Sequence, residues 1–539
     1  MPENRLTVYG WIPLWLVLVI TALLCRPPLP IDETRYLSVA WEMWQNHQFL
    51  VPHINGLPYS HKPPLLFWLI QAGWAVFGVN DWSARLTAPI FALFSILLTR
   101  HLSGKLWPKQ RQIQTIVPYL FIGTLFWSFY STLTMFDMLI GFFSLVAWLG
   151  LWTGRDGKRY LGRLVYAAAI GLGILAKGPV ILVYTAPPAL LAPWWMGREK
   201  STSWKAWYGG FFLSLAAGIL LALAWALPAA KAGGAQYGQA ILLGQTAGRM
   251  VHSFAHQRPV YWYLLLLPLL LFPWPFCPSF WSAIRQLRPT SQVKFCLSSI
   301  VPGFFLLSAI SGKQIHYLLP LLPPIILLIS RAMTEIMATK TASTRLLAMI
   351  LLLFSLALLV SPTLPLHGGD SEMLHYLPRP LGIIPLITAL FFLQRQHVTN
   401  CIPKTAAILG TMLIFLHFTL APSLHALYDA QAVGEKIHAV QATGNEVAVY
   451  PARLADQFQF AGRLTKPLSE KNTMEEIVRW AQKHTGQYVL LLLDKTTCPF
   501  FSDNGTVQPF SNRWLLFRPA SGIIADYQQW KTETLSAEK

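Results

Sequence analysis

Long apolar runs separated by short polar segments dominate the first four-fifths of the chain. A helix needs about 20 apolar residues to cross the hydrocarbon core of a membrane. On this criterion we predict about thirteen spans, at residues 8–25, 83–99, 113–131, 135–152, 161–176, 178–195, 207–229, 260–281, 293–311, 317–333, 345–362, 378–394 and 405–424. The chain is therefore predicted to be an α-helical polytopic membrane protein.

The polar segments between these runs alternate in charge. One set is rich in Lys and Arg and comprises residues 100–111, 155–163, 198–205, 285–294, 331–345 and 395–404. Short basic loops of this kind stay in the cytoplasm. Thirteen spans with a cytoplasmic N-terminus place the C-terminus outside, which predicts an N-in/C-out topology.

Composition supports a membrane protein and argues against a nucleic-acid partner. Hydrophobic residues make up 54% of the 539 residues and charged residues only 12%, compared with about 25% charged residues in soluble domains. The net charge of +19 invites a nucleic-acid interpretation. However, the basic residues occur in short clusters between apolar runs, so we attribute them to topology and expect membrane lipids as partners.

Two long outer segments and a C-terminal domain complete the predicted architecture. The first outer loop, 26–82, contains two helical stretches, Thr34 to His47 and Leu65 to Phe77, that suit the membrane interface. A second long outer loop covers 230–259. We predict a transmembrane domain over 1–429 and a small soluble α/β domain over 430–539. The latter has strands near 446–450, 487–493 and 512–518 and a helix from Asn472.

The strongest chemical signal lies in the first outer loop, which contains Asp32-Glu33-Thr34-Arg35-Tyr36 and, further on, His61-Lys62-Pro63-Pro64. Two carboxylates directly after a membrane span either serve a site or stabilise a helix N-terminus. The two prolines fix the backbone before the next segment and hold Lys62 where it can meet an anionic head group. The alternative is a lysine that merely extends to the interface.

Further motifs follow in order, at residues 82–86, 134–137, 176–179 and 311–320. Together with the first outer loop they resemble the GT-C glycosyltransferases of the protein O-mannosyltransferase-like superfamily. Within it the chain looks most like the bacterial lipid A aminoarabinose transferases. In that family the loop reads Asp-Glu-x-Arg-Tyr and then Glu-Lys-Pro-Pro. Here His61 stands where the family has Glu, which weakens the assignment of the sugar but not of the reaction class.

The resemblance implies an inverting transfer of a sugar from an undecaprenyl phosphate-linked donor. It places the reaction on the periplasmic face of the bacterial inner membrane, with lipid A as the leading acceptor. A protein hydroxyl or another envelope glycan remains an alternative acceptor. No other cofactor is predicted, and a divalent metal is left open.

The leaving phosphate of such a donor requires cations at membrane depth. The candidates for this role are Lys62, Lys177, Arg249 and Lys313, with Tyr317 as a hydrogen-bond donor. Asp32 is the candidate catalytic carboxylate, acting as a base or stabilising positive charge on the sugar. Asp137 is the second candidate, for acceptor contacts or structural support.

Four other residues complete the predicted site: Glu33, Arg35, Tyr36 and His61. Arg249 lies in an outer segment that looks like the loop that closes over the donor in the family. The same segment contains His252 and His256, which with His61 make a weak candidate metal site. Solvated loop histidines are the favoured alternative.

Two other classes of function compete with a transferase. A transporter or flippase of lipid-linked glycans would carry ionisable residues near the middle of its spans. Here the charged residues lie at span ends on one face, which favours an enzyme. A receptor acting through its C-terminal domain is the third class, and that domain has no recognisable catalytic constellation.

Overall fold

The structure is a computed structural model that describes residues 8–197, 203–242, 244, 257–336, 341–360, 378–393, 396–502 and 505–537. The chain forms two compact units. The first comprises Met1–Leu23, Ser60–Ala357 and Gly382–Leu416. The second comprises Leu24–Tyr59, Leu358–Leu381 and His417–Lys539.

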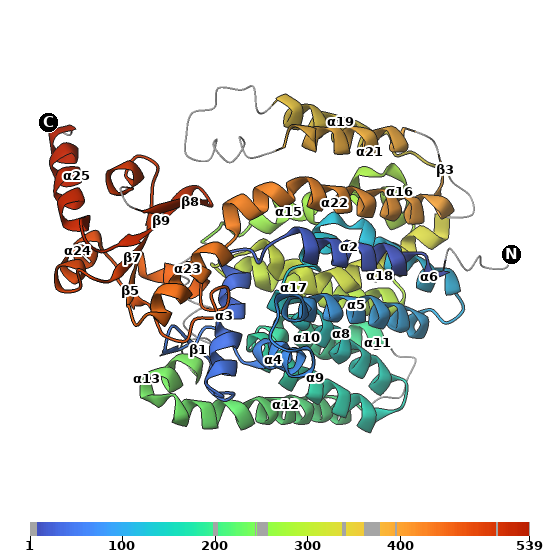
Figure 1. Cartoon of the computed structure of the whole chain (residues 1–539). Coiled ribbons are helices and arrows are strands. Elements are labelled where there is room, and N and C mark those ends of the chain that lie inside the picture. The colour runs from blue at the N-terminus through green and yellow to red at the C-terminus, as the bar shows by residue number, and fades with distance from the viewer. Residues whose placement is uncertain are drawn as a thin grey trace. The chain divides into compact units, whose positions relative to one another are not determined.

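Apolar helices build the first unit (Figure 1). In the described part of the chain, seven helical stretches are long and apolar enough to cross a membrane. They are α5 (Asp81–Leu106), α8 (Phe136–Arg155), α9 (Arg159–Lys177), α12 (Trp204–Ala232), α17 (Ser291–Ala309), η3 with α18 (Ile315–Ile336) and Cys401–Ala442. Shorter apolar helices are α2 (Trp11–Cys25), α4 (Leu65–Phe77), α10 (Ile181–Leu190), α19 (Arg345–Val360) and α21 (Ile383–Phe392). A helical polytopic membrane protein is thereby confirmed.

Several predicted spans are divided into two helices. The span expected at 260–281 consists of α15 (Trp262–Leu270), η2 (Trp274–Phe276) and α16 (Pro278–Arg285). Pro273 and Pro275 cause this break, because proline cannot donate the backbone hydrogen bond that continues a helix. Similar divisions separate α6 (Arg111–Gly123) from α7 (Leu125–Tyr130), and α10 from α11 (Ala192–Met196). Two further helices are α13 (Gly234–Gln239) and α22 (Val398–Tyr428). Strand β3 (Thr341–Ala342) precedes α19, and its antiparallel partner β4 (Gln396–His397) directly precedes α22.

Helices α8 and α9 form an antiparallel hairpin that positions the candidate site. Only residues 156–158 connect them. The two helices touch where a Cβ on Gly162 would lie 2.6 Å from the carbonyl oxygen of Gly150, so any larger residue would force them apart. The first turn of α8 therefore lies beside the last turn of α9.

The second unit contains a five-stranded mixed sheet in the order β6-β5-β7-β9-β8. The strands are β6 (Ser469–Glu470), β5 (Val447–Tyr450), β7 (Tyr488–Leu493), β9 (Arg513–Pro519) and β8 (Thr506–Phe510). Strands β6, β5 and β7 run parallel to one another, and β9 pairs antiparallel with both of its neighbours, β7 and β8. The three predicted strands correspond to β5, β7 and β9, whereas the two edge strands escaped prediction because β6 is very short and β8 is polar.

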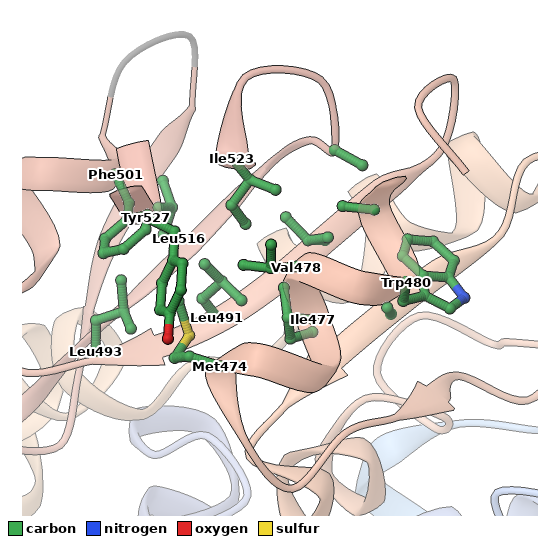
Figure 2. Close-up of a cluster of buried hydrophobic side chains, with 14 of the residues drawn as sticks. Met474, Ile477, Val478, Trp480, Leu491, Leu493, Phe501, Leu516, Ile523 and Tyr527 are labelled. Atoms are coloured by element: carbon green, nitrogen blue, oxygen red, sulfur yellow. The ribbon is translucent and has the colours of Figure 1, made fainter. Parts of the chain in front are cut away.

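Helices α23 (Gln431–Ala442), α24 (Met474–Lys483) and α25 (Ile523–Ala537) accompany this sheet. The N-terminus of α24 is capped by the Thr473 hydroxyl, which accepts a hydrogen bond from the Glu476 amide at 3.2 Å. Figure 2 shows Ile477 and Val478 of α24 in one apolar cluster with Leu491 and Leu516 of the sheet. Burial of this helix face fixes the domain core.

The first outer loop adds a helix and a hairpin to the second unit. Helix α3 (Asp32–Gln45) and α4 match the two helical stretches expected from the sequence, while the hairpin β1 (His53–Ile54) and β2 (Leu57–Pro58) was not expected. The indole of Trp41 donates to the carbonyl of Leu464 at 2.9 Å. Helix α3 thus packs against the segment that follows β5.

Asn55, at the tip of the hairpin, holds it to the same segment. Its side-chain amide donates to the Leu468 carbonyl at 2.9 Å and to Glu470 at 2.7 Å. Its side-chain oxygen accepts from the Leu468 amide at 2.7 Å and from Gln459 at 2.9 Å. Its backbone φ is 51°, in the left-handed region that Asn tolerates.

We expect Asn55→Ala to lower the free energy of unfolding of the second unit by about 2–4 kcal/mol. The substitution leaves buried polar groups without their hydrogen-bond partner, and it strains the backbone because alanine tolerates the left-handed region poorly. Thermal unfolding of the purified protein in neutral detergent measures the change. Asn55→Gly is the matched control, since it removes the same hydrogen bonds and relieves the backbone strain. An unchanged melting temperature for Asn55→Ala would contradict this role.

Candidate active site

A buried ion pair joins the ends of the α8–α9 hairpin. Asp137 lies in the first turn of α8 and Lys177 is the last residue of α9. The Lys177 Nζ lies 2.6 Å from Asp137 Oδ1, and the carboxylate is almost fully buried. Both positions also suit the helix dipoles, which favour an anion at an N-terminus and a cation at a C-terminus.

Lys62 supplies a second cation near this pair. Pro63 and Pro64 precede α4, so Lys62 is fixed at the entrance to that helix. Its Nζ lies 5.9 Å from the centroid of the Phe136 ring, and its charge acts on Asp137. The predicted Lys62, Asp137 and Lys177 are therefore brought together.

Two residues of the segment 311–321 lie beside this ion pair. Lys177 Nζ lies 4.6 Å from the ring centroid of Tyr317. His316 Nε2 lies 3.8 Å from Asp137 Oδ2. The Tyr184 hydroxyl donates to the Tyr317 carbonyl at 2.8 Å and so fixes the turn that carries both residues.

Lys313 has a different environment. It is 3% exposed and donates to the carbonyls of Arg258, at 2.9 Å, and Ile310, at 2.5 Å. These bonds tie the end of the second long outer loop to the segment before η3. The two bonds use two of the three N–H donors of the ammonium group.

Two lysines act on one carboxylate in this group. Lys177 pairs directly with Asp137, and the charge of Lys62 also acts on it. Such a group at the ends of apolar helices is suited to an anion that arrives from the lipid phase. We refer to Lys62, Asp137, Lys177, His316 and Tyr317 as the cationic cluster.

Of the predicted residues in the first outer loop, His61 and Lys62 belong to the first unit and the others to the second, namely Asp32, Glu33, Arg35 and Tyr36. The Tyr36 hydroxyl donates to Asp32 Oδ1 at 3.1 Å, and Asp32 is partly exposed. Glu33 is buried and forms an ion pair with Arg26, while the Leu29 amide donates to it at 3.0 Å. Glu33 therefore fixes the chain before α3, whereas Asp32 stays accessible.

Arg35 forms an ion pair with a residue that the sequence did not indicate. Its Nε lies 3.6 Å from Asp456 Oδ2. Burial raises the pKa of Asp456 to about 6, and the Arg35 charge opposes this rise while Glu470 adds to it. Burial likewise raises the pKa of the nearby Glu42, against hydrogen bonds from the Gly56 and Asn55 amides.

These pKa values predict that the second unit loses stability as the pH rises. The ordinary pKa of Asp456 is 3.8, and its folded value of about 6 favours the protonated form in the native state. Its contribution is complete below pH 3.8 and is lost through about pH 6. Melting temperatures between pH 4 and 7 should fall less steeply in Asp456→Asn than in wild type. Asp494→Asn, at an exposed aspartate, is the control, and equal slopes for all three proteins would refute the prediction.

Three predicted residues, Arg249, His252 and His256, lie outside the described residues. His61, the third member of the weak candidate metal site, is described and exposed. Within the described ranges no group of three or more His, Cys, Asp or Glu side chains is arranged to hold a metal ion. The metal prediction therefore stays a prediction.

Residues 61–225, which contain three members of the cationic cluster, match the family described as dolichyl-phosphate-mannose-protein mannosyltransferase. This part of the chain is therefore similar to that glycosyltransferase family. The resemblance inferred from the first outer loop and the later motifs is thereby confirmed. The family segment contains Lys62, Asp137 and Lys177 but ends before His316 and Tyr317.

Curated relatives extend the likeness. An undecaprenyl phosphate-alpha-4-amino-4-deoxy-L-arabinose arabinosyl transferase of Pseudomonas aeruginosa (strain UCBPP-PA14) is 31% identical over 314 residues, covering 56% of this chain and 55% of the relative. The transferase of the same name from Enterobacter sp. (strain 638) is 24% identical over 314 residues, covering 57% and 56%. The matched region thus spans about half the length of these relatives.

A solved structure has the same fold. ArnT from Cupriavidus metallidurans in the apo state superposes with a TM-score of 0.71 at 17% identity, covering 95% of this chain and 99% of that chain. The same protein bound to undecaprenyl phosphate gives a TM-score of 0.70 at 18% identity. The helical membrane part and the C-terminal mixed sheet therefore share the fold of this ArnT.

Sequence reasoning missed His316, Tyr184 and Asp456 as members of these groups. His316 precedes the predicted Tyr317 within the motif at 311–320, and that position was the available signal. Tyr184 lies in an apolar run and Asp456 in the short 3-10 helix η6 (Ala452–Gln457), and neither segment carries a motif.

Proposed function

We propose that the chain transfers 4-amino-4-deoxy-L-arabinose from an undecaprenyl phosphate-linked donor to lipid A. The observation that carries this proposal is the cationic cluster, which sets two ammonium groups around one carboxylate at the ends of apolar helices. The names of the relatives support the donor. The ArnT structure bound to undecaprenyl phosphate supports a lipid phosphate as the ligand of this fold.

The chemistry assigned to the cluster is stabilisation of the leaving group. The bond between the sugar and the phosphate oxygen breaks, and polyprenyl phosphate departs with the electron pair and an additional negative charge. Lys62 and Lys177 neutralise that charge, and the Tyr317 hydroxyl donates a hydrogen bond. Attack by the acceptor on the opposite face of the sugar inverts the anomeric configuration.

The other predicted residues complete this proposal. Asp32 is the carboxylate that takes the acceptor proton or stabilises positive charge on the sugar, with Tyr36 as its hydrogen-bond partner. Lys313 and Arg249 are additional phosphate ligands. Asp137 positions Lys177 through their ion pair.

We further infer the topology from the charge pattern. About thirteen spans, with the N-terminus inside and the C-terminus outside, place the reaction on the periplasmic face of the bacterial inner membrane. The division into a transmembrane domain, 1–429, and a periplasmic domain, 430–539, remains part of the same proposal.

The test is a transfer assay with purified protein. Undecaprenyl phosphate-linked aminoarabinose and other lipid-linked sugars serve as donors, and lipid A, a protein and an envelope glycan serve as acceptors. Transfer to lipid A with release of undecaprenyl phosphate is expected, and the anomeric configuration of the product measures inversion. Because His61 replaces the Glu of the family motif, the panel of sugars is essential.

The assay also separates the competing transporter. Donor movement across sealed vesicles without transfer to any acceptor would overturn the transferase proposal. Transfer to a protein or glycan, but not to lipid A, would keep the reaction and replace the acceptor.

A further inference from the structure

A cavity of about 480 Å³ lies at the opposite end of the α8–α9 hairpin from the cationic cluster. It is bordered by the end of α8, the start of α9 and the start of α12. Arg155, Arg159 and Arg163 line it, and none of the described lining residues is acidic. Its aromatic lining includes Tyr166 and Trp207.

Close packing of α9 and α12 fixes one of these arginines. The Arg163 guanidinium donates to the carbonyl of Ala206 at 2.7 Å. A Cβ on Gly210 would overlap the same guanidinium, so the glycine provides the room that it occupies. Arg163 is therefore held at the wall of the cavity.

The other two arginines differ in environment. The Arg155 guanidinium lies 4.3 Å from the Trp152 ring centroid, and its Nη1 lies 3.4 Å from the half-exposed Asp156. Arg159 is exposed at the first turn of α9. Among the described residues, Asp156 compensates one of the three charges, so the described lining carries a net positive charge.

The position of the cavity indicates the source of that ligand. Helix α8 has 20 residues, which corresponds to a length of about 30 Å, the thickness of a hydrocarbon core. The cationic cluster and the cavity therefore lie at opposite membrane faces. Near the cavity, Leu161 and Leu164 are 50% and 68% exposed, so apolar surface is available beside the arginines.

We propose that this cavity binds the phosphate head group of an anionic phospholipid from the leaflet opposite the cationic cluster. Guanidinium groups suit a phosphate because their paired N–H donors match its oxygens. Basic pockets between membrane helices bind lipid head groups in this way. The acyl chains lie along the exposed leucines of α9. This site is separate from the proposed transfer reaction and does not depend on it.

Native mass spectrometry of the full chain in neutral detergent tests the proposal by titration with phosphatidylglycerol and, separately, phosphatidylcholine. Wild type should retain phosphatidylglycerol preferentially, and the double variant Arg159→Ala/Arg163→Ala should bind it at least tenfold more weakly. Arg111→Ala is the matched control, because Arg111 is an exposed basic residue at a helix start that does not line the cavity. The single variant Arg159→Ala, at the exposed position, provides the test if loss of Arg163 prevents folding.

Two results would overturn the proposal. Equal weakening by Arg111→Ala would mean that general surface charge binds the lipid. Displacement of phosphatidylglycerol by millimolar inorganic phosphate would identify a free phosphate as the occupant. Since lipid binding is measured without sugar transfer, failure here would leave the transferase proposal untouched.

Discussion

Asp32→Asn should lower the rate of sugar transfer by about 10²- to 10⁴-fold, the range that a positioned acid or base contributes. The substitution removes the negative charge and keeps an oxygen at the position that accepts the Tyr36 hydrogen bond. The structure around α3 is therefore preserved. The measurement is the initial rate with saturating donor, together with the melting temperature.

The competing explanation for Asp32 is stabilisation of the N-terminus of α3. An exposed carboxylate in a first helical turn contributes only about 0.3–1 kcal/mol, so that role predicts a small drop in melting temperature and little loss of rate. Glu476→Gln, in the first turn of α24, is the matched control and should transfer at the wild-type rate. A rate loss of less than tenfold in Asp32→Asn would remove Asp32 from the proposed site.

Lys177→Met should reduce the turnover number by about 10²- to 10³-fold, because it removes a cation from the leaving phosphate. It should also lower the melting temperature, since loss of one partner of a buried ion pair costs about 3–5 kcal/mol. His316, 3.8 Å from Asp137, limits this cost by remaining as a partner. Lys177→Arg keeps the charge and should retain more activity than Lys177→Met.

The double variant Asp137→Asn/Lys177→Met distinguishes the roles of the two residues. It leaves no unpaired buried charge, so its melting temperature should exceed that of Lys177→Met. If Asp137 acts only by positioning Lys177, the double variant should be no slower than Lys177→Met. A further rate loss of tenfold or more would show that Asp137 acts on the substrate independently.

The sequence was sufficient for those parts of the fold that depend on local pattern. Every predicted span contains helix among the described residues, and α3 and α4 begin close to the residues expected for them. Apolar run length and the positions of prolines carry that information locally. The sequence motifs indicated Asp137 and Lys177 separately. Prediction of a hairpin between these two spans would have been enough to place the two residues side by side.

Contacts between distant residues could not be predicted. Asn55 forms hydrogen bonds with Leu468, and Arg35 forms an ion pair with Asp456. Each pair is separated by about 400 residues in the sequence. Nothing in the local pattern of either partner specifies the other. The hairpin that carries Asn55 was missed for a related reason, because its strands have two residues each and no alternation to detect.

The pairing of Asp137 with Lys177 also bears on how the hairpin enters the membrane. Translocating a charge against a potential of 100 mV requires about 2.3 kcal/mol of electrical work, but a carboxylate and an ammonium that cross together require almost none. The other end of the hairpin carries Arg155, Lys158 and Arg159 against Asp156 alone. Moving that end across the membrane would translocate two net positive charges and require about twice this electrical work. Membrane insertion therefore favours translocation of the neutral end, with the basic turn left on the side from which the hairpin enters.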